Sequence, residues 1–144
     1  MAILSDESKA LLHRGFAQAR AANHLSMTVE HLMVEMLREV AVVQFLQRCG
    51  TDVETLRALL DAKIASFRAA QIETVGTQPN EEFTRVTRRA IDAAEAAGRR
   101  LVLPSDLFLA ILEEGTGFTA TLIRQQTGDP RAFDALRQRR AASR

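Results

Sequence analysis

Apolar residues recur along this chain with the spacing of a buried helical face, and the strict alternation typical of β-strands is nearly absent. A residue suited to cap a helix precedes most of the apolar runs, and a glycine or asparagine follows several of them. The pattern therefore predicts an all-α chain with helices at residues 6–23, 28–39, 41–49, 52–67, 80–98, 104–115, 118–128 and 129–138.

The run at residues 27–37 is repeated about 75 positions later at residues 103–112. Thr28 can cap the first of these helices, because its hydroxyl can accept a bond from a free backbone N–H. Each helix then has an acid in its first turn, Glu30 or Asp106, where the helix dipole favours a negative charge. Two copies of one helix start, each followed by an apolar run, indicate a duplicated unit.

The duplication predicts a molecule of two similar halves. A shift of 75 positions aligns Arg14 with Arg89, and Asn23 with Gly98, which are both suited to end a helix. Such halves usually pack about a pseudo-twofold axis, so we expect an eight-helix double repeat with a groove at the seam. The expected divisions are repeat one at about residues 3–67, a linker at 68–79, repeat two at about 80–138 and a basic tail at 139–144.

Composition narrows the class of protein. With 144 residues, 47% of them hydrophobic and 26% charged, the chain has the make-up of one soluble globular domain. A net charge of +1 and the lack of Trp and Tyr argue against nucleic-acid binding, which stays an alternative only through the arginines. The single cysteine, Cys49, indicates a reducing compartment. No apolar run approaches about 20 residues and no signal peptide precedes the first helix, so we expect a cytoplasmic protein without a membrane span.

Motifs for cofactor or nucleophilic chemistry are missing from the sequence. It contains no phosphate-binding glycine loop, no paired cysteines and no His-Glu-x-x-His pattern, so we expect no cofactor. Cys49 falls at an apolar helix end and is interpreted as a packing residue. His24 and His31 flank the organising run and, with Glu30, are weak candidates for a surface zinc site. The more ordinary interpretation is surface or capping histidines.

Arginines form two groups near the second repeat. Arg85, Arg88 and Arg89 follow one another on a single predicted helix. They are either a solvated stripe, paired in part with acids of the same helix, or a basic edge that meets an acidic partner. A second group is interpreted as a solvated linker and consists of Arg137, Arg139, Arg140 and Arg144.

Three stretches carry a resemblance to the Clp N-terminal domain, which is a double Clp repeat. Residues 16–20 (FAQAR) and 27–32 (MTVEHL) resemble its first repeat. Residues 77–90 (TQPNEEFTRVTRRA) resemble the start of its second repeat, in the form typical of ClpA-type unfoldases. The resemblance extends over nearly all of residues 3–138. It implies a compact eight-helix domain that precedes AAA+ ATPase rings, performs no chemistry, and docks adaptors and substrates for unfolding and regulated proteolysis.

The resemblance also implies docking residues. His24 matches a histidine typical of the ClpA first repeat, and Asp106 matches an acid that ClpB-type domains use near their substrate groove. The adaptor of ClpA-type proteins is ClpS, which brings N-degron substrates. Together with the basic edge, the matching positions predicted to bind partners are Glu30, Gln78, Pro79, Thr84, Arg85, Arg88 and Asp106.

The sequence departs from the family pattern at several places. Leu25 stands where ClpA-type sequences tend to have an acid, which puts one adaptor contact in doubt. Residues 80–82 (NEE) replace a more neutral stretch. Ser105 stands where ClpC-type domains have a second glutamate, so recognition of phosphoarginine by paired acids is not expected. The sequence ends at Arg144 without an ATPase module.

We therefore predict a non-catalytic docking domain, monomeric in isolation, with a charged rim at Glu30 and Arg85 and apolar contacts at the seam. Its expected partners are a ClpS-type adaptor, substrate proteins and the AAA+ ring of a Clp unfoldase, tethered or in trans. One alternative is a free-standing Clp-repeat protein that binds the adaptor or the Clp complex as a regulator. A second alternative is a small enzyme whose groove carries His24, Glu30, His31 and Asp106.

Overall fold

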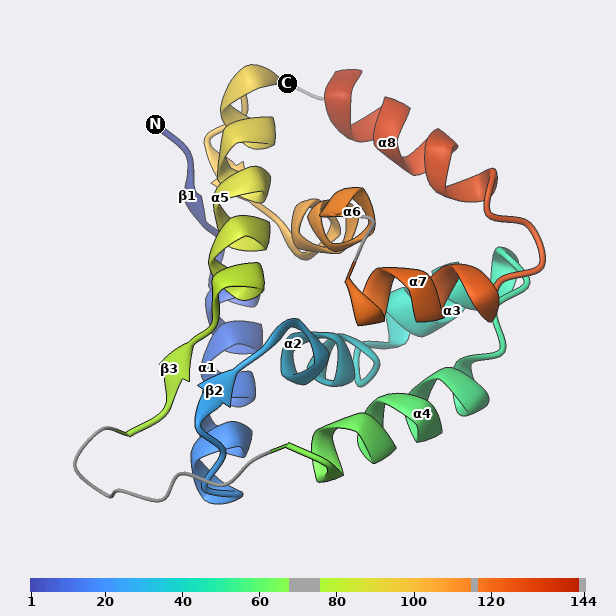
Figure 1. The fold of residues 1–144 in the computed structure, drawn as a ribbon. Helices are drawn as coiled ribbons and strands as arrows, with labels where there is room; N and C mark the ends of the chain where they lie inside the picture. Colours follow the sequence, from blue (N-terminus) through green and yellow to red (C-terminus); the bar gives the residue numbers. More distant parts are fainter. Residues whose placement is uncertain (68–75, 115–116, 143–144) are drawn as a thin grey trace.

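Two groups of four helices form the molecule in a computed structural model (Figure 1). The structure describes residues 1–67, 76–114 and 117–142. Within these residues the first group consists of α1 (Asp6–Ala21), α2 (Val29–Met36), α3 (Val40–Arg48) and α4 (Val53–Ala65). The second group consists of α5 (Glu81–Ala96), α6 (Pro104–Glu114), α7 (Phe118–Gln125) and α8 (Ala132–Ala142). The predicted all-α duplicated architecture is confirmed.

Side-chain caps begin the leading helix of each half at equivalent positions. Ser5 Oγ accepts a hydrogen bond from the Ser8 N–H ahead of α1, and Asn80 Oδ1 accepts one from the Phe83 N–H ahead of α5. These bonds satisfy N–H groups that have no partner inside a first helical turn. Ser5 and Asn80 are 75 positions apart, so the duplication includes the cap.

The same two helices end in the same way. Just beyond α1, Asn23 has a φ of 56°, and just beyond α5, Gly98 has a φ of 72°. This left-handed conformation lets the chain leave a helix, and glycine and asparagine adopt it more readily than other residues. The predicted helix ends at Asn23 and Gly98 are therefore confirmed.

Two pairs of very short parallel strands join the halves. β1 (Ile3–Leu4) pairs with β4 (Leu101–Val102), and β2 (Ser26–Met27) pairs with β3 (Gln78–Pro79). Each pair takes one strand from each half. The register matches Ile3 with Leu101 and Ser26 with Gln78, and a shift of 75 positions converts one pair into the other. The sequence pattern does not predict these strands, because two residues are too few to show alternation.

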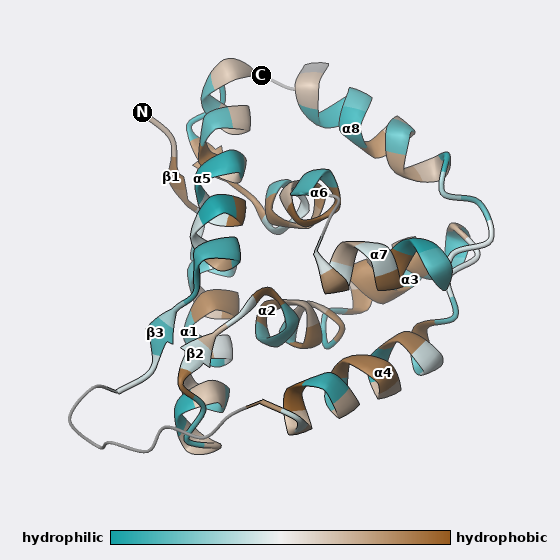
Figure 2. Cartoon of the chain, viewed as in Figure 1, coloured by the Kyte–Doolittle hydropathy of each residue, from teal (hydrophilic) through white to brown (hydrophobic). Residues whose placement is uncertain are grey.

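The second helix of each half forms the centre of the core. All eight residues of α2 are buried, and so is α6 from Asp106 to Leu112. Figure 2 shows that α5 and α8 are largely hydrophilic, whereas α3 and α4 carry more hydrophobic residues. Among the described residues, no helix combines the length and the apolar character that a bilayer span requires.

Two sequence predictions need correction near the chain's connections. The predicted linker lies partly outside the described residues, and its last part, Gln78–Pro79, forms β3. The basic tail expected at 139–144 is wrong for residues 139–142, because α8 continues through Ala142. Arg137 and Arg140 of this helix are not solvated linker residues either. Each of them binds a carboxylate of α6, so α8 is held against α6 within the second half.

Candidate functional site

Five of the predicted partner-binding residues lie on one exposed surface, which we call the α5 face. It consists of β3 and the first two turns of α5. All five side chains are exposed. Because β3 runs directly into the Asn80 cap, the chain has little freedom between the strand and the helix, and the five positions are held together. The residues of the α5 face are Gln78, Pro79, Thr84, Arg85 and Arg88.

An open groove of about 530 Å³ adjoins the α5 face. Pro79, Phe83 and Ile91 provide apolar surface in this groove, and Arg88 lies at its charged side. The Phe83 ring is fixed from behind by an edge-on contact with Phe16, with the two ring centroids 6.0 Å apart. The groove therefore offers apolar contacts next to exposed charge, as protein-binding surfaces commonly do.

The arginines of α5 differ in their pairing. Arg85 Nε lies 3.2 Å from Glu114 Oε2, and Arg89 Nη2 lies 3.0 Å from Glu114 Oε1. These bonds, first that from Arg89, lower the pKa of Glu114 below its ordinary value. Arg88 is exposed and forms no ion pair with the described residues. One of the two interpretations of the sequence pairs these arginines in part with acids of α5, but the partner of Arg85 and Arg89 comes from α6.

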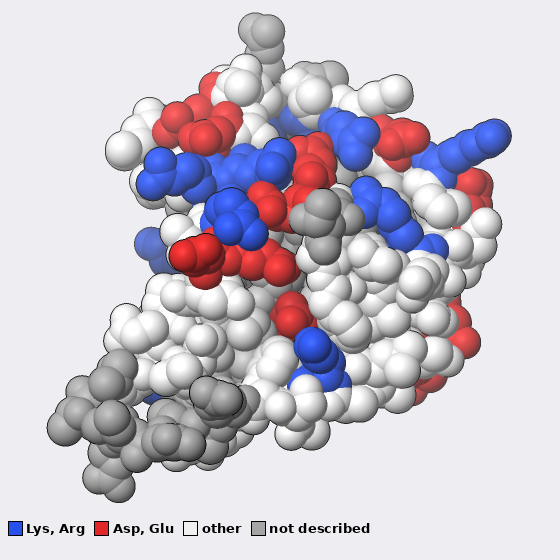
Figure 3. Space-filling model, viewed as in Figure 1, with Lys and Arg blue, Asp and Glu red and all other residues white. Residues whose placement is uncertain are grey.

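Charged side chains are unevenly distributed over the molecule. Figure 3 shows basic and acidic side chains gathered in the half of this view that α5, α6 and α8 occupy, with fewer of them over α2 and α4. Both signs occur within the charged half, and Arg88 lines one hollow together with Arg85, Arg89, Asp92 and Glu114. This arrangement favours specificity and orientation of a docked partner over general attraction of one charge.

The sequence predicts that Glu30 lies on an exposed charged rim, and this prediction is wrong. Only 8% of the residue is exposed. Its Oε2 accepts a hydrogen bond of 2.9 Å from Thr119 Oγ1, so the carboxylate links α2 to α7 across the seam. Burial, followed by the nearby charge of Glu30, raises the pKa of Glu82 above its ordinary value. Glu30 therefore contributes to the interior of the seam.

Asp106 is also buried, at a different place. Its carboxylate accepts hydrogen bonds from the Leu103 N–H and from the guanidinium groups of Arg99 and Arg140. Burial alone would raise the pKa of Asp106, but the bonds from Arg99, Arg140 and the Leu103 N–H lower it below the ordinary value. Asp106 thus fixes the start of α6 and is not part of the α5 face.

His24 and His31 meet in the first half, as their spacing suggested. His24 Nδ1 and His31 Nε2 are 3.0 Å apart. The Thr28 N–H donates to His31 Nδ1 at 3.1 Å, so the proton of neutral His31 is on Nε2 and points to His24. Burial, followed by His24, lowers the pKa of His31 to about 4. His31 is therefore a neutral capping residue inside the protein.

The candidate zinc site and the candidate reaction centre are not assembled. Among the described residues, no three side chains of His, Cys, Asp or Glu are placed to hold a metal ion. Glu30 points to Thr119, His31 to His24, and Asp106 to two arginines. Of the four side chains proposed for a small enzyme, only His24 and His31 contact each other, whereas Glu30 and Asp106 have partners elsewhere.

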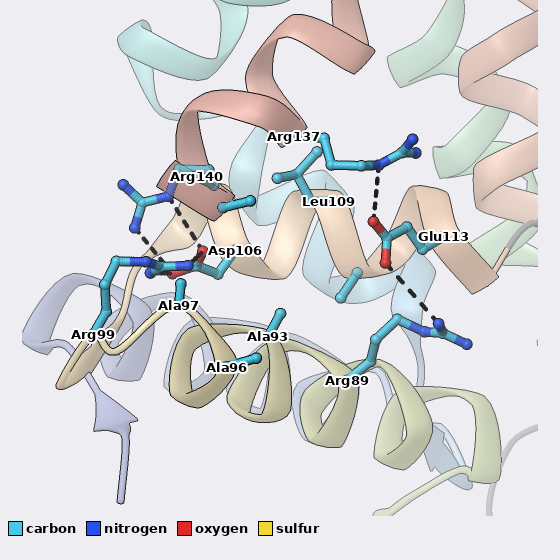
Figure 4. A pocket seen from close by; sticks show the side chains of 12 residues that line it. Arg89, Ala93, Ala96, Ala97, Arg99, Asp106, Leu109, Glu113, Arg137 and Arg140 are labelled. Atoms are coloured by element: carbon cyan, nitrogen blue, oxygen red, sulfur yellow. Dashed lines mark hydrogen bonds and ion pairs between the residues drawn. The ribbon is translucent and has the colours of Figure 1, made fainter. Parts of the chain in front are cut away.

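A pocket between α5, α6 and α8 was missed by the sequence analysis. This α8 pocket has a volume of about 260 Å³, and Figure 4 shows that alanines of α5 face α6 and α8 across it. Arg99 and Arg140 converge on Asp106 at one end, and Arg137 binds Glu113 at the other. One sequence signal could have indicated this pocket. A shift of 75 positions places Arg99 and Asp106 where the first half has His24 and His31.

The fold and the site define a duplicated all-α domain with an exposed polar face beside an apolar groove. Comparison with known families agrees. The family described as Clp repeat (R) N-terminal domain matches residues 3–126. Since this is most of the sequence, the chain belongs to the Clp repeat N-terminal domain family, and the resemblance expected from residues 16–32 and 77–90 is confirmed.

Similar proteins extend this result. A curated protein of Fuscovulum blasticum, named ClpA homolog protein, is 27% identical over 128 residues, which cover 87% of this chain and 16% of the relative. The chain thus spans about one sixth of that relative's length. The Hsp104 N-terminal domain from Candida albicans has a TM-score of 0.79 at 11% identity, covering 97% of this chain and 89% of the other. A complex of the ClpV N-domain with a VipB peptide has a TM-score of 0.70 at 16% identity, covering 96% and 82%. These structural likenesses establish the shared fold.

Proposed function

We propose that this chain is a non-catalytic docking domain of a ClpA-type unfoldase, acting in the cytoplasm. In this proposal a ClpS-type adaptor, carrying its substrate, binds the α5 face, and the AAA+ ring of the unfoldase receives the substrate. The observation that carries the proposal is the convergence of five predicted docking residues on one exposed surface beside an apolar groove. Family membership and the ClpA homolog relative support the choice of system.

Two features of the α5 face support protein docking in particular. Arg88 is exposed without an ion pair among the described residues, so pairing it with a partner's acid breaks no existing ion pair. Pro79 and Phe83 give the adjoining groove an apolar surface on which a partner can bury its own apolar side chains. Apolar anchors would supply most of the affinity, and the exposed charges would set orientation and association rate. The bound ClpV N-domain provides a precedent within the fold for peptide binding.

The test is a calorimetric titration of the chain with the ClpS-type adaptor of the same organism. We expect saturable one-to-one binding that Arg88→Ala weakens about fivefold, the loss typical of a rim charge. Arg20→Ala is the matched control, because Arg20 is also exposed but lies at the end of α1. Absence of binding by the folded wild type would reject the adaptor. Equal affinity of the wild type and Arg88→Ala, with binding intact, would reject the α5 face.

A further inference from the structure

Two arginines share one carboxylate at the end of the α8 pocket. Arg99 Nη1 and Nη2 lie 2.6 Å and 2.7 Å from the two oxygens of Asp106. Arg140 Nε and Nη2 each lie 3.2 Å from an oxygen of the same carboxylate. The side chains of Arg99, Arg140 and Asp106 are only 8%, 17% and 1% exposed. Two positive charges face one negative charge with little water around them. The cluster therefore carries an uncompensated positive charge, which favours binding of a second anion.

One nitrogen of this cluster is left without a hydrogen-bond partner among the described residues. This nitrogen is Arg99 Nε, which is buried. Buried donors are nearly always paired, because leaving one unpaired costs free energy. The unpaired donor belongs to the side chain that is the more deeply buried of the two arginines. Nε has almost no accessible surface, so it is a strained donor of the cluster and is not itself a contact for a ligand in the pocket.

The corresponding space in the first half is filled. There the fourth helix, α4, buries Leu60 and Ile64 in the core, and the Phe67 ring covers His24 and His31 at centroid distances of 5.7 Å and 5.4 Å. The fourth helix of the second half is α8, which is far more hydrophilic than α4 (Figure 2). The side chains that α8 turns to the pocket are Arg137, Arg140 and Ala141. Phe133 and Leu136 of α8 pack against the core, but the positions of α8 that face the pocket carry no large apolar side chain, and this leaves the pocket open.

The lining of the pocket specifies a ligand with two parts. Small and apolar side chains form its floor, among them Ala93, Ala97 and Leu109, and the arginines stand at its ends (Figure 4). The lining carries four arginines against two acids. A cavity of about 150 Å³ accepts a benzene-sized group. A volume of about 260 Å³ therefore accommodates an apolar side chain together with an anionic group.

We propose that the α8 pocket binds the C-terminus of a polypeptide whose last residue is apolar. The last side chain lies on the alanine floor, and the α-carboxylate accepts hydrogen bonds from the arginines at the Asp106 end. A chain end suits this lining because its apolar side chain and its carboxylate branch from the same Cα. An internal acidic residue has polypeptide on both sides, so the pocket would have to accommodate the backbone that enters it and the backbone that leaves it. This site lies apart from the α5 face and does not depend on the adaptor.

Fluorescence anisotropy with labelled hexapeptides tests the proposal. The probe ends in leucine with a free carboxylate, and the two comparison peptides end in leucine amide or in serine. We expect saturable binding of the probe and at least about tenfold weaker binding of both comparison peptides, since each loses one of the two contacts. A fourth peptide with an internal Leu-Asp and an amidated end is expected to bind as weakly. No binding of the probe, or equal binding of the amide or the internal peptide, would overturn the proposal.

Variants then locate the binding. Ala93→Leu places a larger side chain on the pocket floor without removing any ion pair, so we expect it to abolish probe binding. Its control is Ala62→Leu, on the exposed side of α4. Arg140→Gln removes one of the two guanidinium groups at the Asp106 end and should weaken binding about fivefold or more, whereas Arg139→Gln, outside the lining, should not. Unchanged binding by folded Ala93→Leu would reject the pocket. Arg88→Ala should leave probe binding intact, which separates this test from that of the adaptor.

Discussion

The hydroxyl oxygens of Thr51 and Thr127 lie 2.8 Å apart, although the residues are 76 positions apart in the sequence. The two backbones also form an antiparallel bridge at these residues. A shift of 76 positions, one more than the shift that relates the leading helices of the two halves, makes Thr51 and Thr127 equivalent. Equivalent residues can meet in an antiparallel manner only at a twofold axis, so this pair marks the pseudo-twofold axis of the duplicated fold.

The threonine pair predicts that its two single substitutions lower the free energy of unfolding by different amounts. Thr127 Oγ1 donates to the Ile123 carbonyl at 2.6 Å, so Thr51 must donate to Thr127. Thr127→Val leaves the buried Thr51 hydroxyl without an acceptor and should cost about 2 kcal/mol, whereas Thr51→Val should cost about 1 kcal/mol. The double variant should be no less stable than Thr127→Val alone. Urea unfolding measures all four proteins, and additive losses would contradict the assigned bond.

The buried histidine predicts a dependence of stability on pH. His31 has a pKa of about 4 in the folded protein and about 6.5 when unfolded. Between these values the unfolded chain binds a proton that folded His31 does not bind. Stability is therefore complete above pH 6.5 and falls as the pH decreases toward 4, by about 3 kcal/mol in total. Urea unfolding at pH 7.5, 5.5 and 4.5 measures this loss.

A variant isolates the contribution of His31. His31→Gln can still accept from the Thr28 N–H but does not titrate, so its stability should vary less over this range. Glu82 acts in the opposite direction, because its raised pKa lowers stability as the pH rises above 4.5, but it does so in both proteins. His13→Gln is the control, since His13 is exposed. Equal pH profiles of wild type and His31→Gln would contradict the prediction.

The helix end at Gly98 predicts a purely conformational loss. Its φ is +72°, and an added Cβ would meet no heavy atom within 4 Å. Gly98→Ala should therefore lower the free energy of unfolding by about 1 kcal/mol through backbone strain alone. Gly98→Asn should lose less, because asparagine tolerates this conformation better. Thermal and urea unfolding measure both losses, and an alanine variant as stable as the wild type would refute the explanation.

The seam predicts that the charge of Glu30 contributes to the raised pKa of Glu82. Glu30→Gln keeps an oxygen for the Thr119 hydroxyl but removes the charge that disfavours ionisation of Glu82. We expect the pKa of Glu82 to decrease, while its burial keeps part of the elevation. Carbon-detected NMR titration of the side-chain carboxyl measures it. Glu81→Gln, one residue away but exposed, serves as the control and should shift Glu82 less.

Much of the fold was predictable because its signals are local. The caps at Ser5 and Asn80 and the helix ends at Asn23 and Gly98 each depend on a few neighbouring residues, and they repeat with one spacing. The contact of His24 with His31 was also within reach, because both histidines flank one short turn. Periodicity and spacing carry this kind of information directly.

The remaining features depend on contacts that spacing does not encode. Glu30 is buried because Thr119 approaches it from the other half, 89 positions away. Arg140 reaches Asp106 across 34 positions, so a helix interpreted as a basic tail is fixed to the core. The exposure of the α5 face could be predicted from the polar residues themselves, but the α8 pocket depends on which side chains α8 turns inward.

The strand pairs have a mechanical consequence. β1 of the first half is bonded to β4 of the second, and β2 is bonded to β3. These strand pairs therefore hold the halves together at two points. A force that pulls the halves apart acts on both strand pairs at once. Neither four-helix half can separate while these strand pairs remain bonded. A half produced alone would present two unpaired strand edges. The domain should therefore transmit force as one stiff element and yield in a single step.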